Sequence, residues 1–377
     1  MRTKRQQAYD KFIYCFPFDV YNFFADLRNL RRTMKYRAGK EFRENYRKVV
    51  VPYWRQFGVR PPRLWCKHMY HLTGSLDPRY IPNPIHYRNI ITYFDDPSYE
   101  HVMEDKNLYS VLFPSVKRPE TICKHFATTI YGNAPDHYTD DDFTPLSREE
   151  AVRRCLAGGK FIIKPTCDTG GGSDVKSFSS EDGAEAIEAL FDSYRGVDFI
   201  IQRFVKQHAD LARLNDSSLN TMRIVTMVFH EKPYLLSAIL RVGHQGSPVD
   251  NYSSGGYQCT ILPDGTLDRL AATKVSGVDE YVEENENGLR FEGIRVPSWD
   301  AAQKLVMELA VKLPHLKYIG WDIAVDEDGD LVLIEFNCHI DQNQETCGPT
   351  FGDMTDEVLA DVFRDRIEKR KGKKARG

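Results

Sequence analysis

Two short apolar runs near the end of the chain, WDIAV at 321–325 and LVLIEF at 331–336, flank the turn-rich segment DEDGD. Two such runs around a turn are the sequence signal of a β-hairpin. Side chains alternate between the faces of a strand, so Glu335 and Asn337 point to the same face. If the loop has an even number of residues, the pairing places Asp322 on that face as well. The hairpin would then gather two carboxylates and an amide oxygen on one patch of a sheet.

The pattern of apolar and polar positions elsewhere predicts a mixed α+β architecture. A capping box of Ser147 and Glu150 opens a helix that ends at the Gly158–Gly159 pair. The other predicted helices cover 99–113, 182–194, 301–313 and 355–371, and the other predicted strands cover 160–165, 199–205, 222–229, 234–242 and 257–262.

The first hundred residues follow a different pattern. Residues 1–60 are rich in aromatic residues and helical in pattern, with interruptions at Pro17 and Pro52. Residues 59–96 are rich in proline and irregular, which is typical of either a linker or an extended wrap over another part of the fold. The tyrosines of this segment favour a packed wrap.

Composition places the chain among globular proteins of two or three domains. It has 377 residues, 41% of them hydrophobic, and no apolar run of about 18 residues that could cross a membrane. Its first residues lack the apolar core of a signal peptide, so we expect a cytoplasmic protein. The eight cysteines are scattered without a CxxC pair, which argues against a zinc site and a disulfide framework.

The net charge of −3 hides an asymmetry along the chain. Residues 1–60 carry fifteen Lys/Arg against five Asp/Glu, so the remainder sums to −13. Most of the surplus lies in residues 28–48. We expect these residues to form either a docking face, for an acidic polymer, an anionic membrane surface or enzymes of glycan biosynthesis, or a solvated helix face. We expect no nucleic-acid partner.

The three polar residues of the hairpin suit a magnesium ion. Asp322, Glu335 and Asn337 offer hard oxygen ligands, which Mg²⁺ prefers, and the ion commonly completes its shell with water and substrate phosphates. The alternative is a hairpin whose polar residues lie on a solvated face. An ionisable Glu335 between Ile334 and Phe336 in an otherwise apolar strand favours the metal site.

A second signal is the strand and glycine loop at 160–175. Lys164 leaves the strand shortly before three consecutive glycines, Gly170, Gly171 and Gly172. Glycines let backbone N–H groups approach an anion closely, and a nearby lysine neutralises phosphate charge. The loop matches neither a Walker A sequence nor GxGxxG, so a simple flexible turn is the alternative.

Other polar residues lie at the ends of predicted strands. Arg223 and Arg241 could clamp a phosphate or carboxylate bidentately, although each alone is also a common surface residue. Residues 338–351, with Asp341, Gln342 and Gln344, follow the metal strand and either line an acceptor site or reflect ordinary loop polarity. No nucleophilic triad is evident, so covalent catalysis by the protein is not indicated.

Taken in order, these motifs resemble those of the ATP-grasp superfamily. They are an Asp-Lys pair, the strand lysine with its glycine loop, QRFV, NTMR, a strand-terminal arginine, an asparagine before Gly-Gly, and GWD followed by EFN. Within the superfamily, DPRYIPNPIHYRNI, DKNLYSVLF, SSLNTMRIVT, VDNYSSGG and GPTFGDMTDEVL resemble the sugar-transfer-associated ATP-grasp family, which is linked to polysaccharide biosynthesis. The resemblance covers about residues 74–363.

The resemblance implies a fold of two α+β lobes that sandwich ATP. It implies a helical N-terminal region and wrap at 1–97, a small lobe with the glycine loop at 98–200, and a large lobe with the metal site at 201–377. It also implies roles for single residues. Lys106, Lys164, Gly170, Gly171 and Gly172 would hold the phosphates; Gln202, Phe204 and Val205 would meet adenine, with Asp210 or His208 near the ribose; Asp322, Glu335 and Asn337 would hold one or two Mg²⁺; and Arg223, Arg241 and Asn251 would grip the transferred group. Gln202 departs from the commoner glutamate.

Three functions follow from the resemblance. The first is an ADP-forming carboxylate–amine ligase that works through an acyl phosphate and joins an amine to a sugar acid or glycan carboxylate. The second is a kinase that phosphorylates a small-molecule or sugar acceptor with the same residues. The third is a nucleotide-binding scaffold in glycan assembly.

Overall fold

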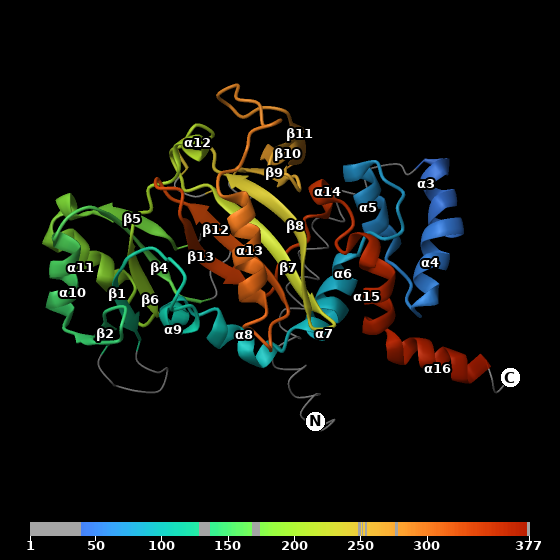
Figure 1. Cartoon of the computed structure of the whole chain (residues 1–377), viewed down its shortest axis with the longest axis horizontal. Coiled ribbons are helices and arrows are strands. Elements are labelled where there is room, and N and C mark those ends of the chain that lie inside the picture. The colour runs from blue at the N-terminus through green and yellow to red at the C-terminus, as the bar shows by residue number, and fades with distance from the viewer. Residues whose placement is uncertain are drawn as a thin grey trace.

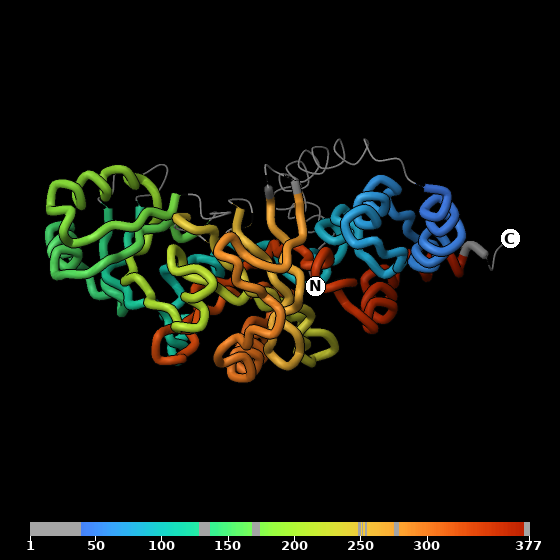
Figure 2. The backbone as a smooth tube through the Cα atoms, turned by 90° about the horizontal axis from the view of Figure 1, so that it is seen from above, coloured from blue at the N-terminus to red at the C-terminus, as the bar shows by residue number. Residues whose placement is uncertain are grey.

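Antiparallel strands form two sheets that lie next to each other along the long axis of the molecule (Figures 1 and 2). The computed structural model describes residues 39–127, 136–167, 174–247, 250, 252, 255–275 and 278–374. Within this part of the chain, six strands make one sheet, seven make the other, and helices from both ends of the chain pack beside the larger sheet. The predicted α+β class is confirmed.

The smaller sheet has the strand order β3-β2-β1-β6-β4-β5 and is covered by two helices. Phe161, Ile163 and Phe199 are fully buried in the cluster between this sheet and those helices. Ser147 caps the first helix by accepting a hydrogen bond from the Glu150 N–H at 3.1 Å, as predicted. The elements are β1 (Thr121–Phe126), β2 (His137–Thr139), β3 (Pro145–Leu146), α10 (Arg148–Leu156), β4 (Lys160–Pro165), β5 (Lys176–Ser179), η5 (Ser180–Asp182), α11 (Ala184–Ser193) and β6 (Phe199–Arg203).

The larger sheet has the order β11-β10-β9-β8-β7-β12-β13, and α13 covers one of its faces. Ile224, Trp321 and Ile323 from neighbouring strands are fully buried in the cluster that includes this helix. The predicted strands cover β7, β8, β9, β12 and β13 of this sheet but miss β10 and β11; in the smaller sheet they cover β4 and β6 and miss β1, β2, β3 and β5. The elements are α12 (Ala209–Ala212), β7 (Thr221–Phe229), β8 (Lys232–Val242), β9 (Tyr257–Ile261), β10 (Leu267–Val275), β11 (Val278–Val282), α13 (Trp299–Ala310), β12 (Tyr318–Val325), β13 (Leu331–Asn337) and α14 (Gln344–Cys347).

The opposite face of the larger sheet has an apolar end and a charged end. At the apolar end, Val225 and Tyr318 share a hydrophobic cluster with Trp54 from the N-terminal helices and Phe363 from the C-terminal ones. These helices lie together at one end of the molecule in Figure 1. Arg223 lies two residues before Val225 on β7, so its side chain points to the same face but lies beyond the apolar cluster. This charged end faces the smaller sheet.

The prediction of irregular structure for 59–96 was wrong, because most of this segment is helical. Prolines stand at the first turns of these helices, as at Pro84 and Pro97, where the missing N–H costs nothing. The described part of the chain before residue 97 contains the helices α3 (Lys40–Asn45), η2 (Tyr46–Val50) and α4 (Val51–Gln56), and, within the proline-rich segment, α5 (Arg63–Thr73), α6 (Asn83–Ile85), η3 (His86–Ile91) and α7 (Thr92–Phe94).

Two predicted helices are broken. The helix expected at 99–113 divides into α8 (Pro97–Met103), η4 (Lys106–Leu108) and α9 (Tyr109–Leu112), because Asp105 has extended backbone and caps η4 through the Asn107 N–H. The terminal helix divides into α15 (Thr355–Val362) and α16 (Arg364–Lys374) at the buried Phe363, and η7 (Gly352–Met354) precedes it. The pattern of apolar and polar positions shows neither break.

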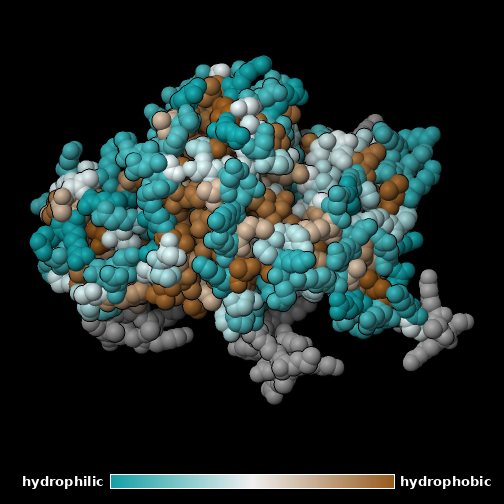
Figure 3. Space-filling view, viewed as in Figure 1, coloured by the Kyte–Doolittle hydropathy of each residue, from teal (hydrophilic) through white to brown (hydrophobic). Residues whose placement is uncertain are grey.

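The surface agrees with this arrangement of cores. On the face shown in Figure 3, apolar residues gather near the centre, over the sheet and α13, and hydrophilic residues dominate the periphery. Among the described helices, none is long and apolar enough to span a bilayer.

Candidate active site

The β12–β13 hairpin brings Asp322 and Glu335 directly opposite each other, as the alternation predicted. The expected route, an even loop, was wrong. Five residues, 326–330, separate the strands, which alone would pair Asp322 with Ile334. An irregularity after Asp322 skips Ile334, so the register shifts by one residue and restores the carboxylate pair. Gly320 pairs with Asn337, which keeps all these positions on one face.

Two arginines converge on Asp322 from neighbouring strands. Arg223 on β7 pairs with Asp322 in register and donates from Nε to Oδ1 and from Nη2 to Oδ2, the second at 2.8 Å. Arg241, at the end of β8, donates from Nη1 to Asp322 Oδ2 at 2.9 Å and from Nη2 to Asp250 Oδ1 at 2.9 Å. Thr221 also donates to Asp250. The structure thus brings the predicted Arg223 and Arg241 together at the predicted metal residue.

Two lysines approach the same patch from the other side. Lys106 in η4 places its Nζ 3.2 Å from Glu335 Oε2 and 3.3 Å from the Thr166 carbonyl oxygen just after β4. Lys164 on β4 lies close enough to Glu335 and Lys106 for their charges to affect it. Lys106 therefore connects the loop after β4 with β13, the strand that carries Glu335.

These charges perturb one another strongly. Burial raises the pKa of Glu335, but the surrounding cations outweigh it and lower the value to about 2; they are Lys106, Lys164, Arg223 and Arg241. Burial and the charge of Lys106 lower the pKa of Lys164 to about 8. Burial also acts to lower the pKa of Lys106, but the Glu335 carboxylate raises it above the ordinary value. The patch holds more positive than negative side chains, which favours an anionic ligand.

The outer edge of β13 is fastened by the segment that carries Lys106. Cys338 N–H donates to Glu104 Oε1 at 2.6 Å, Phe336 N–H donates to the Tyr109 hydroxyl at 3.3 Å, and Leu333 N–H donates to the Lys117 carbonyl at 2.9 Å. A free sheet edge is thereby covered, and Glu335 is held between two anchored positions. Neither Glu104 nor Tyr109 could be predicted from the sequence as a site residue, apart from their position near the Asp-Lys pair.

The donor set fits a magnesium ion that shares its shell with phosphate and water. No group of three His, Cys, Asp or Glu side chains gathers among the described residues; the set is two carboxylates and one amide. Arginines use three of the roughly four lone-pair positions of Asp322, so one remains. The amide nitrogen of Asn337 is buried and makes no hydrogen bond in the described part of the chain, so it can donate to an oxygen of a phosphate held beside the metal ligands.

The predicted adenine-binding segment follows β6. Gln202 is buried, with its Nε2 3.5 Å from the Pro119 carbonyl oxygen. Phe204 N–H donates to Lys160 at 3.1 Å, whereas no hydrogen bond among the described residues uses the Phe204 carbonyl or the Val205 N–H. One acceptor and one donor are thus free for a planar ring edge.

The residues predicted near the ribose have no described contact with this cluster. Asp210 in α12 is exposed and lies 3.7 Å from His208 Nδ1, without a described contact to the charged patch. Gly170, Gly171, Gly172 and Asn251 lie outside the described residues. Asp250, beside Asn251, was not assigned a role from the sequence, although it is the second partner of Arg241.

Comparison with known proteins places this geometry in a family. The model of the family described as sugar-transfer associated ATP-grasp matches residues 89–346. No curated protein matches the chain.

Solved structures with a similar arrangement are distant in sequence. The ATP-grasp ligase PsnB complexed with minimal precursor is 17% identical over 71% of this chain and 63% of its own, with a TM-score of 0.37. D-alanyl-alanine synthetase A from Vibrio cholerae is 12% identical over 70% and 65%, with a TM-score of 0.40. D-alanine–D-alanine ligase from Bacillus anthracis, complexed with ATP, is 14% identical over 72% and 67%, with a TM-score of 0.34. The chain thus spans less than two thirds of the length of the first of these ligases.

Proposed function

The chain belongs to the sugar-transfer associated ATP-grasp family, and we propose that it is an ATP- and Mg²⁺-dependent carboxylate–amine ligase that works through an acyl phosphate. The observation that carries the proposal is the joint approach of Lys106 to Glu335 and of two arginines to Asp322 on one sheet face. Such a patch offers cations for phosphate oxygens and carboxylates for a metal ion at adjacent positions.

In the first step, a substrate carboxylate oxygen attacks the γ-phosphorus of ATP, and the bond to the β–γ bridging oxygen breaks to release ADP. Lys106 and Lys164 would bind phosphate oxygens, while Arg223 and Arg241 would hold the carboxylate and the transferred phosphoryl group. Asp322, Glu335 and Asn337 would hold one or two Mg²⁺, which neutralise charge on the phosphates.

In the second step, the nitrogen of an amine attacks the acyl carbon. The carbon–oxygen bond to phosphate breaks, inorganic phosphate leaves, and the nitrogen loses a proton to give an amide. The protein forms no covalent bond in either step, so catalysis consists of positioning and electrostatic stabilisation. Phe204 and Val205 would orient the adenine through the free carbonyl and N–H.

The family context suggests a sugar acid or glycan-linked carboxylate as one substrate and an amino acid or another amine as the other, in polysaccharide biosynthesis. The test is a screen of sugar acids against pooled amino acids for ADP release, followed by product mass. Hydroxylamine should trap the acyl phosphate as a hydroxamate.

The Glu335→Gln variant is the negative control for the screen. It keeps the shape of the side chain but removes the charge beside Lys106, so ADP release should fall by at least about a hundred-fold. In the screen with the unmodified protein, phosphate retained on the product would indicate a kinase instead of a ligase. Unchanged ADP release in the variant would refute the assigned metal residues.

A further inference from the structure

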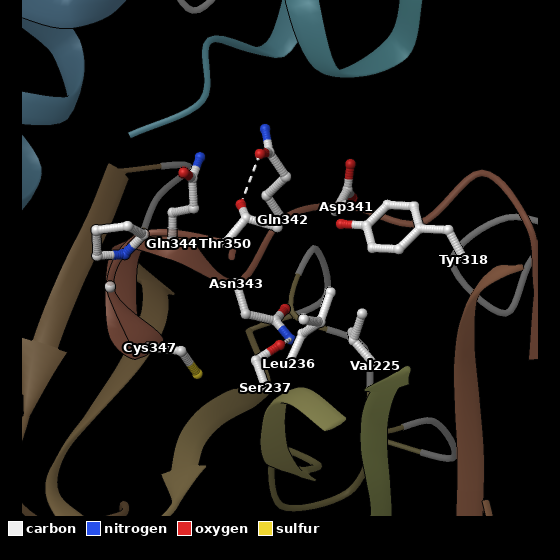
Figure 4. A pocket seen from close by; sticks show the side chains of 12 residues that line it. Val225, Leu236, Ser237, Tyr318, Asp341, Gln342, Asn343, Gln344, Cys347 and Thr350 are labelled. Atoms are coloured by element: carbon white, nitrogen blue, oxygen red, sulfur yellow. Dashed lines mark hydrogen bonds between the residues drawn. The ribbon is translucent and has the colours of Figure 1, made fainter. Parts of the chain in front are cut away.

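A small hollow lies on the same sheet face as the arginines (Figure 4). Val225 on β7 and Ser237 on β8 form its floor and are paired in register. Val225 is two residues from Arg223, a separation of about 7 Å along a strand. A molecule seated in the hollow would therefore reach a group held by Arg223.

The loop that follows the metal strand forms the wall of the hollow. Asn343 donates from Nδ2 to Ser237 Oγ at 3.1 Å, and Thr350 donates to Gln342 Oε1 at 2.8 Å. Figure 4 shows Asp341 beside Tyr318 at one side of the hollow and Asn343 directed toward Ser237. The loop lies close to the sheet because Gly320 has no side chain: a Cβ there would be 2.6 Å from the Ile340 Cγ2.

The segment before α6 and the helix η3 hold this wall in place. Gln342 donates from Nε2 to the Ile81 carbonyl at 3.1 Å, and Gln344 bonds both the N–H and the carbonyl of Ile81, at 2.8 and 3.0 Å. Tyr87 donates to Asp341 Oδ1 at 2.5 Å. The position of Asp341 at the hollow thus depends on a part of the chain that lies almost entirely before the matched family region.

The chemistry of the lining differs from that of the arginine patch. Among the described residues, the lining has one carboxylate, several amide and hydroxyl groups, and no lysine, arginine or histidine. Asp341 gives the hollow a negative potential. In the neighbouring patch the four cations Lys106, Lys164, Arg223 and Arg241 outnumber the carboxylates Asp250, Asp322 and Glu335. The enclosed space is about large enough for one water-sized group, which is also the size of an ammonium group.

We propose that this hollow binds the ammonium end of the amine co-substrate, with Asp341 as its counter-charge. The proposal rests on the proposed ligase function and adds the class of the second substrate: a primary amine that is cationic when it binds and whose remaining atoms lie in the open mouth. The ammonium group gives one proton to water before its nitrogen attacks the acyl carbon. The carboxylate co-substrate would be excluded from the hollow and would bind at the arginines instead. The opposite charges of the two neighbouring sites would thus favour binding of the amine at one and of the carboxylate at the other.

Cys347 lines the hollow and provides a probe that needs no turnover. The rates of its modification by cationic 2-aminoethyl methanethiosulfonate and anionic 2-sulfonatoethyl methanethiosulfonate would be measured by peptide mass spectrometry. The rate for the cationic reagent is divided by the rate for the anionic reagent. The same ratio, measured for this cysteine in urea-unfolded protein, corrects for the intrinsic reactivity of the two reagents. We expect a preference for the cation that Asp341→Asn reduces roughly four-fold. Cys167, near the charge of Lys106, should prefer the anionic reagent and should not respond to the variant.

Competition with small ligands completes the test. Glycinamide, a cation without a carboxylate, should slow modification of Cys347, and glycolate should not. Equal or stronger protection by glycolate, or a preference unaffected by Asp341→Asn, would overturn the proposal. Neither measurement depends on catalysis. A cation-selective hollow in a protein that forms no amide would therefore refute the ligase alone, and amide formation without cation selectivity would refute the hollow alone.

Discussion

At the scale of single residues, the site consists of charges that depend on one another. Asp322 is almost fully buried, and its carboxylate is the common partner of Arg223 and Arg241. These residues could be predicted from the sequence, because strand alternation and motif spacing indicate which side chains share one face of the sheet. It did not reveal that Asp322 pairs with arginines, because the partner of a side chain depends on the order of strands in the sheet.

Replacing Asp322 by Asn should destabilise the fold, because it removes the carboxylate paired with the Arg223 guanidinium and one of the two carboxylates paired with Arg241. The expected loss is about 3–5 kcal/mol of unfolding free energy, measured by urea denaturation. Asp353→Asn is the matched control, since its 3.1 Å pair with Arg79 is exposed and should contribute less than about 1 kcal/mol. Equal losses in the two variants would contradict the buried role of Asp322.

The protonation of Lys164 should make nucleotide binding depend on pH. Its pKa is lowered to about 8, so the charged fraction falls as the pH rises through that value. The affinity for MgATP should therefore decrease between pH 7 and 9, as followed by calorimetry. In Lys164→Arg the guanidinium stays charged, and the decrease should disappear. A decrease that persists unchanged in Lys164→Arg would assign the titration to another group.

At the scale of elements, local patterns identified strands more reliably than their ends or irregularities. The alternation in β13 correctly placed Glu335 and Asn337 on one face. The skipped Ile334 was missed because the register of the two strands depends on their pairing in the sheet. The break at Asp105 is made by a local cap on the Asn107 N–H, which the pattern of apolar and polar positions does not show. The proline-rich segment was misread because proline is tolerated in the first turn of a helix.

Glu104 should act as a positioning residue for the end of β13. Glu104→Ala removes the acceptor of the Cys338 N–H, so we expect a loss of about 1–3 kcal/mol in stability and faster hydrogen exchange at that amide. Glu104→Gln keeps an acceptor oxygen and should largely restore protection. Protection at Cys338 that is the same in all three proteins would show that the contact does not hold the strand.

At the scale of the whole molecule, the N-terminal helices belong to the core of the larger sheet. Trp54 is fully buried and shares a cluster with Val225 and Tyr318, which also lie beneath the hollow. From the sequence, residues 1–60 were predicted to be helical and residues 59–96 to be a linker or a wrap. Their packing against the sheet was not predicted, because their partners in the sheet lie more than 120 residues away along the chain. The site itself is assembled from strands of both sheets, which only the complete topology brings together.

Trp54→Ala should therefore lower the stability of the larger sheet as well as that of the N-terminal helices. We expect a loss of about 3–5 kcal/mol and a single cooperative unfolding transition that includes the larger sheet, followed by circular dichroism and tryptophan fluorescence. Tyr99→Ala, at an exposed side chain outside this cluster, should have a much smaller effect. An early separate transition of the helices alone would show that they form an independent unit.

Isotopic labelling of the carboxylate oxygen atoms tests the acyl phosphate mechanism most directly. A sugar acid that supports ADP release would be labelled with ¹⁸O in its carboxyl group, and the released phosphate would be analysed by mass spectrometry. An acyl phosphate requires that one labelled oxygen leave with each phosphate as the amide forms. Unlabelled phosphate, or phosphate that stays on the product, would contradict the proposed ligase.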